Sequence, residues 1–182
     1  MKSAIGLIEL SSIAKGIEVS DAMLKRADIE IIVNRTICPG KYMILIGGEV
    51  DAVNSSIDTG IEISADELVD NFIIPNVHPS IFPAISGMNP VVNLQALGVI
   101  ESFSVASIIE AADAAVKSAS VELITVYLAM AIGGKGYVML TGDVASVQTA
   151  VDTGAAAISR KGLLVQKVVI PSPRKEILQS WI

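Results

Sequence analysis

Residues 4–31, AIGLIELSSIAKGIEVSDAMLKRADIEI, decide the fold, because residues 96–123, ALGVIESFSVASIIEAADAAVKSASVEL, repeat them with identity at 13 of 28 aligned positions. A second block, GKYMILIGGEVDAVNSSIDTG from Gly40, is matched by GKGYVMLTGDVASVQTAVDTG from Gly134, and an Ile-Pro pair closes each copy at Pro75 and Pro171. Three ordered matches in one chain of 182 residues indicate an internal duplication. We therefore predict two domains, residues 1–90 and residues 91–182, with a linker near residues 86–95.

Each copy has the pattern of a strand, a helix, two strands, a second helix and a last strand. Apolar runs at 4–10, 29–37 and 42–46 predict strands in the first copy, and those at 96–101, 121–130 and 137–140 predict their counterparts. Ser12 and Ser104 occupy the N-cap position before the first helix of each copy. The order βαββαβ predicts a ferredoxin-like unit in each half, and hence an α+β, sandwich-like fold class.

The composition favours an assembling protein over a small soluble monomer. Hydrophobic residues make up 52% of the chain, charged residues only 18%, and the mean hydropathy is +0.62. That is more apolar surface than a small domain usually hides, so we expect oligomerisation. Residues 71–100 carry no Asp, Glu, Lys or Arg, but four prolines interrupt them, which argues against a membrane span.

The charge and the cysteine count exclude further classes. A formal net charge of -6 argues against a nucleic-acid partner. Glu9 interrupts the first apolar run, so we expect no signal peptide. Cys38 is the only cysteine, which excludes an internal disulfide and fits the reducing cytoplasm.

The second copy closely resembles the bacterial microcompartment (BMC) shell domain. The resemblance lies in ALGVIE, EAADAAVKSASVEL, GGKGYVMLTGDVASVQTAVDTGAAA and VIPSPR, in the family's unpermuted order, and the first copy follows the same pattern more loosely. It implies two tandem BMC domains and a cyclic homotrimer that imitates the hexamers of single-domain relatives. It also implies a structural tile in the shell of a cytoplasmic microcompartment, not an enzyme, with the chain itself and other BMC shell proteins as partners.

The turn Thr36-Ile37-Cys38-Pro39-Gly40-Lys41 resembles the pore loop of the propanediol-utilisation branch of tandem-domain shell proteins. There, one cysteine from each of three subunits is taken to bind a 4Fe-4S cluster on the symmetry axis. The resemblance implies Cys38 as a metal ligand, one cluster per trimer shared by three Cys38, an electron relay across the shell and a redox enzyme in the lumen as partner. It also implies a set of pore-lining residues: Ile37, Cys38, Pro39, Gly40, Ile132, Gly133 and Gly134.

Three further positions resemble residues at the tile edge of the family. Lys25 and Lys117 stand at the same place near the end of the first helix of each copy, and Arg174 follows the last strand. His78 takes the corresponding place in the first copy, which leaves its edge role open. Ordinary solvated lysines would give the same pattern.

The residues by themselves leave alternatives open. A lone cysteine is usually a small buried hydrophobe, so Cys38 would be incidental in a cofactor-free tile whose pore passes small metabolites. The two lysines that follow the turns, Lys41 and Lys135, would make the pore rim positive or simply be solvated. A ferredoxin-like trimeric enzyme or sensor is the alternative from another class. His78, the only histidine, lies far along the chain from Cys38, so no catalytic pair is indicated.

Overall fold

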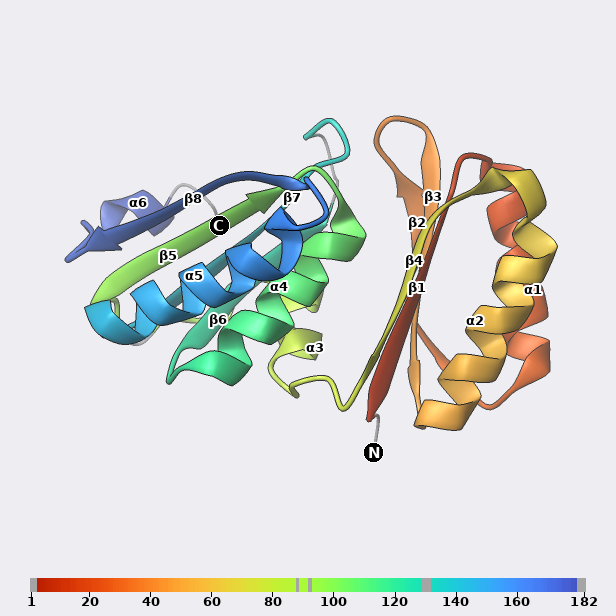
Figure 1. Cartoon of the computed structure of the whole chain (residues 1–182), viewed down its shortest axis with the longest axis horizontal. Coiled ribbons are helices and arrows are strands. Elements are labelled where there is room, and N and C mark those ends of the chain that lie inside the picture. Colours follow the sequence, from red (N-terminus) through yellow and green to blue (C-terminus); the bar gives the residue numbers. More distant parts are fainter. Residues whose placement is uncertain (1–2, 88, 92, 129–131, 180–182) are drawn as a thin grey trace. The chain divides into compact units, whose positions relative to one another are not determined.

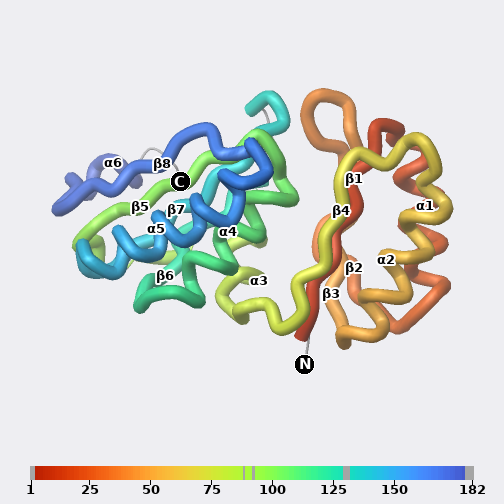
Figure 2. The backbone as a smooth tube through the Cα atoms, viewed as in Figure 1, coloured from red at the N-terminus to blue at the C-terminus, as the bar shows by residue number. Residues whose placement is uncertain are grey.

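The computed structural model describes residues 3–87, 89–91, 93–128 and 132–179. The chain divides into two compact units, Met1–Val77 and His78–Ile182 (Figures 1 and 2). The same order of strands and helices appears in both units, which confirms the α+β fold class and the duplication. Within the described residues, no helix is long and apolar enough to cross a membrane.

The first unit is a four-stranded sheet with two helices. The strands lie in the order β2-β3-β1-β4, and every neighbouring pair is antiparallel. The predicted elements are present, and the structure adds a 3₁₀ turn, η1, before the last strand. The bounds are β1 Ala4–Leu10, α1 Ile13–Arg26, β2 Glu30–Ile37, β3 Lys41–Gly48, α2 Val50–Ser64, η1 Ala65–Glu67 and β4 Leu68–Pro75.

The second unit repeats this sheet in the order β6-β7-β5-β8, again antiparallel throughout. Two short helices, α3 and α6, were not predicted, and the last two residues of the predicted strand 121–130 lie outside the described residues. The bounds are α3 Ile81–Ser86, β5 Ala96–Ser102, α4 Val105–Ser118, β6 Glu122–Leu128, β7 Gly136–Gly142, α5 Val144–Ser159, β8 Leu164–Pro171 and α6 Glu176–Gln179.

In the first unit, α1 and α2 cover one face of the sheet (Figure 1). Because strand residues alternate between faces, Ile8 and Leu10 of β1 point to the helices together with Ile44 of β3. At Gly6 the second helix lies so near that a Cβ atom would come within 2.6 Å of Ile57 Cγ1. Gly98 of β5 has the same close approach to α5, so both copies use a glycine to admit the second helix.

The predicted N-caps are confirmed in both units. The Ser12 hydroxyl accepts a hydrogen bond from the Lys15 amide at 3.3 Å, and the Ser104 hydroxyl accepts one from the Ser107 amide at 3.4 Å. Each bond satisfies an N–H group that the first helical turn leaves without a partner.

The apolar stripe of α1 does not face the core of its own unit. The helix packs on the sheet through Gly16, Val19 and Met23, whereas Ile13, Ile17 and Leu24 are 42%, 58% and 46% exposed. Their repeat equivalents on α4 are Val105, Ile109 and Val116, which are 1%, 0% and 8% exposed. The two copies therefore share one apolar pattern on the first helix but differ in how far it is buried.

Candidate functional site

The turn that resembles a pore loop joins β2 to β3 in the first unit. It is closed by a hydrogen bond from the Gly40 amide to the Ile37 carbonyl at 3.0 Å, and Gly40 adopts a φ of +86° that favours glycine. Ile37 is only 5% exposed, so its side chain lies inside the unit. Cys38 is half-buried, while Pro39 and Gly40 are exposed at the tip.

The corresponding turn of the second unit precedes β7. Gly133 and Gly134 have φ values of +67° and +84°, and the Lys135 amide donates to the Ile132 carbonyl at 3.3 Å. A Cβ atom at Gly133 would have no neighbour within 4 Å, so the tip of this turn is open. Both turns thus present short, glycine-containing tips.

The lysines that follow the turns do not extend into solvent as free cations. Lys41 Nζ lies 2.7 Å from Glu9 Oε1, and Lys135 Nζ lies 2.8 Å from Glu101 Oε1. A carboxylate of the first strand therefore offsets the charge of each ammonium group, whereas the sequence left open a positive rim or simply solvated lysines. Glu9 and Glu101 recur at equivalent positions just as the lysines do, but their recurrence alone did not reveal the pairing, which depends on the strand register.

The 4Fe-4S cluster predicted from the resemblance is not supported, and that prediction is wrong. Among the described residues, no three His, Cys, Asp or Glu side chains come together in a way that could hold a metal ion. Cys38 is the only thiol in the sequence, whereas iron–sulfur clusters are usually held by four thiolates. We assign Cys38 no ligand role, so the electron relay and the redox partner lose their basis.

The predicted tile-edge lysines lie in different surroundings. Lys25 pairs with Asp21 at 2.5 Å, and both side chains are well exposed, at 74% and 62%. Lys117 pairs with Asp113 at 2.6 Å, but here the carboxylate is only 9% exposed, and its other oxygen accepts the His78 backbone N–H at 2.8 Å. Arg174 is exposed beyond β8. The structure therefore places all three at the surface but fixes Lys117 more firmly.

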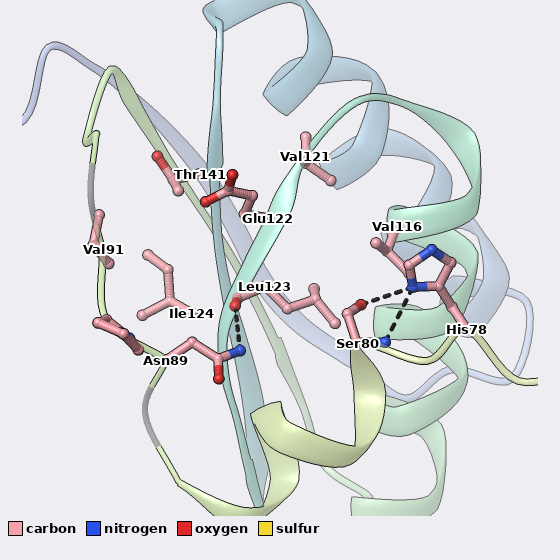
Figure 3. A pocket seen from close by; sticks show the side chains of 11 residues that line it. His78, Ser80, Asn89, Val91, Val116, Val121, Glu122, Leu123, Ile124 and Thr141 are labelled. Carbon is pink, nitrogen blue, oxygen red and sulfur yellow. Dashed lines mark hydrogen bonds between the residues drawn. The ribbon is translucent and has the colours of Figure 1, made fainter. Parts of the chain in front are cut away.

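His78 lies at the edge of a pocket of the second unit (Figure 3). Its Nδ1 atom is 2.8 Å from the Ser80 hydroxyl and accepts the Ser80 amide N–H at 3.3 Å. On the other side of the pocket, the Asn89 side-chain amide donates to the Leu123 carbonyl at 2.9 Å. These side chains hydrogen-bond to the backbone around α3 and β6, and they form no nucleophile–base arrangement.

A second hollow lies on the sheet face that α4 and α5 leave open. It is lined mainly by apolar side chains of β5, β7 and β8 and by Ile177 and Leu178 of α6. Tyr137 lies in it and stacks on Tyr127, with ring centroids 5.1 Å apart. Burial, and secondarily the neighbouring Tyr127, raise the pKa of Tyr137 to about 12. Among the described residues that line the hollow, the charged ones are Lys135 and Glu101, and they pair with each other.

The chain is similar to shell proteins along its full length. It is 47% identical over 182 residues to the bacterial microcompartment shell protein PduT of Citrobacter freundii, covering 100% of this chain and 99% of that protein. A microcompartment protein from Desulfitobacterium hafniense, known from its crystal structure, is 49% identical with a TM-score of 0.91, over 97% of this chain and 98% of that one. The shell protein EutM of Salmonella typhimurium is 44% identical over 84 residues, which are 46% of this chain and 85% of EutM.

PduT and EutM are both named as shell proteins, and the similarity to PduT over the full chain confirms the resemblance to a tandem-domain shell protein. The model of the BMC domain matches the chain twice, at residues 4–77 and 96–173, so the match includes both sheets and their helices. The chain therefore belongs to the family of bacterial microcompartment shell proteins, as a member with two tandem BMC domains.

Proposed function

We propose that the protein forms a cyclic homotrimer, whose six BMC domains surround a central opening through which small metabolites pass. In this proposal the trimer is a pseudohexameric wall tile of a microcompartment shell. Membership of the shell protein family supports the structural role, and the tandem repeat supports the count of two domains from each of three chains.

The observation that carries the proposal is the exposed apolar stripe of α1, formed by Ile13, Ile17 and Leu24. Its repeat equivalents on α4 are at most 8% exposed, so the same helix face is buried in one copy and open in the other. A ring of alternating first and second domains gives every such face a neighbour, and a second copy of this chain is the occupant we assign to the α1 stripe. The exposed fractions of the three residues together equal about one and a half fully exposed apolar side chains. Burial of that area contributes about 2–4 kcal/mol per interface.

The two turns form the opening in this proposal. The tips offer Cys38, Pro39 and Gly40 from the first unit and Ile132, Gly133 and Gly134 from the second. Ile37 is 5% exposed and supports the turn from beneath. With no cofactor to fill the opening, it would pass small polar solutes.

The edges of the tile would be the surfaces that meet other tiles. Lys25, Lys117 and Arg174 are the residues we assign to these edges, because all three are at the surface and match the family positions. The partners of these edges would be further copies of the trimer and other BMC shell proteins.

The single thiol of the chain gives a direct test of the opening. If three Cys38 residues converge on an axis, short bifunctional thiol reagents will join the subunits of a dilute sample. The yield of joined subunits will fall once the spacer is shorter than the distance between two Cys38 thiols. A protein with the thiol moved to α2, Cys38→Ser/Asp58→Cys, is the matched control, since Asp58 is exposed on a helix away from the turn. Trimers in which Cys38 is never joined, at any spacer length, would contradict the proposed opening.

A further inference from the structure

The ion pair beside the turn is built in the same way in both copies. Lys41 and Lys135 are the first residues after their turn tips, and each places its ammonium group within 2.8 Å of a glutamate of the first strand, Glu9 or Glu101. These four residues are related by the internal repeat. The arrangement therefore does not depend on one accidental side-chain position.

The strand register explains why each lysine reaches its glutamate. Glu9 is opposite Met43 in the β1–β3 ladder, and Lys41 is two residues before Met43, so its side chain lies on the same face. The second unit has the same relation, with Glu101 opposite Tyr137. In both units the pairing with the last strand shifts register just after the glutamate, and such irregularities re-aim side chains.

The two pairs differ in exposure and in their acidic neighbours. The Glu9 side chain is 5% exposed and that of Lys41 33%, whereas those of Glu101 and Lys135 are 34% and 39% exposed. Asp70 of β4 is opposite Glu9, while a neutral residue, Gln166 of β8, is opposite Glu101. The first copy thus has a second carboxylate residue opposite its glutamate, and the second copy has none at that register position.

We propose that Glu9 and Glu101 set the charge of the central opening, by holding the lysine ammonium groups against the sheet and away from the turn tips. This inference rests on the proposed function. With the pairs intact, the lysines add no net positive charge to the ring of turns, so the opening does not concentrate anions. Without the carboxylates, the ammonium groups of three chains would form a cationic ring that attracts multivalent anions.

The test uses the second copy, because its glutamate is partly exposed and has no acidic neighbour in register. Glu101→Gln keeps the side-chain shape and removes the charge, so a role in packing alone would leave Lys135 unchanged. Glu122→Gln is the matched control, since it removes one exposed carboxylate from another strand of the same sheet. The readout is the rate at which a lysine-specific acylating reagent modifies Lys135 in the assembled protein, followed by mass spectrometry.

We expect Glu101→Gln to raise the acylation rate of Lys135 about two- to fivefold, the range for a partly exposed ion pair. Glu122→Gln and Glu101→Asp are expected to stay near the wild-type rate. Citrate should then protect Lys135 in the Glu101→Gln trimer and not in the wild type. An unchanged acylation rate overturns the inference, whatever the state of the opening. A raised rate without citrate protection overturns the proposed opening but not the pairing.

If Glu101→Gln does not assemble, the wild-type protein gives a second measurement. Salt screens a partly exposed pair, so the acylation of Lys135 should rise with ionic strength relative to that of the exposed Lys175. An equal salt dependence of the two lysines would overturn the inference.

Discussion

Replacing Ile17 by glutamate should break the trimer without unfolding the domain. Ile17 is 58% exposed at the centre of the α1 stripe, between Ile13 and Leu24. The helix packs on the core of its unit through other residues. The substitution therefore removes apolar area from the proposed interface and leaves the packing of α1 on the sheet intact.

The magnitude follows from the exposed fraction. Complete burial of an isoleucine contributes about 1.5–3 kcal/mol, so the exposed part of Ile17 accounts for about 1–2 kcal/mol at one interface. A carboxylate buried there without a partner costs about 1–3 kcal/mol more. The sum of about 2–5 kcal/mol corresponds to a loss of roughly 30- to 4,000-fold in the association constant of an interface.

The assay is sedimentation velocity over a wide range of protein concentration, with circular dichroism to confirm that the variant is folded. Ala14→Glu is the matched control, because Ala14 is exposed on the same helix and one turn before Glu18 on its polar face. We expect trimers for the wild type and for Ala14→Glu, and folded monomers for Ile17→Glu. A folded Ile17→Glu protein that associates as tightly as the wild type would refute the assignment of this stripe to the subunit interface.

Four further predictions concern single residues. Ser104→Ala removes the N-cap of α4 and should lower the free energy of unfolding by about 0.5–2 kcal/mol in urea titrations. Gly154→Ala would place a Cβ atom 2.6 Å from the Ala111 carbonyl oxygen, a backbone atom, and should cost about 1–3 kcal/mol. Gly133→Ala meets no neighbour within 4 Å and should cost only about 1–2 kcal/mol, from its φ of +67°. The pKa of Tyr137 is raised from 10.0 to about 12 in the folded chain, so between pH 10 and pH 12 this phenol ionises more readily in the unfolded chain. The free energy of unfolding should therefore fall as the pH rises through this range. Phenolate absorbance follows the titration, and urea midpoints follow the stability.

The duplication and the local signals made most of the fold predictable from the sequence. Hydrophobic runs placed the strands of the two sheets, and the caps at Ser12 and Ser104 were found because an N-cap depends on neighbouring residues alone. The short helices α3 and α6 were missed, because four to six residues carry too little periodicity to be recognised.

The site was less predictable, because its contacts join residues far apart in the sequence. The Lys41–Glu9 pair spans 32 residues and depends on the strand register, which the sequence does not state. The α1 stripe had helical spacing, but periodicity identifies an apolar face without saying whether the core of the same unit or another surface covers it. The prediction of a 4Fe-4S cluster failed for a different reason, because it depended on resemblance at one cysteine and not on a set of ligands in this chain.

Tandem fusion lets two related domains use the same residues differently, and the edge lysines illustrate how. The Asp–Lys pair on the first helix is common to both copies, but only Asp113 also accepts the His78 backbone N–H, at 2.8 Å. That contact comes from the segment just after the first domain, so a single-domain relative has no fused segment of this kind to supply it. Because Asp113 is held by two donors, Lys117 is tied to a fixed carboxylate, whereas Lys25 pairs with an exposed one. In the proposed trimer, the edges assigned to these lysines would therefore alternate between one whose lysine pairs with an exposed carboxylate and one whose lysine is already positioned. A ring of six identical domains cannot make this distinction.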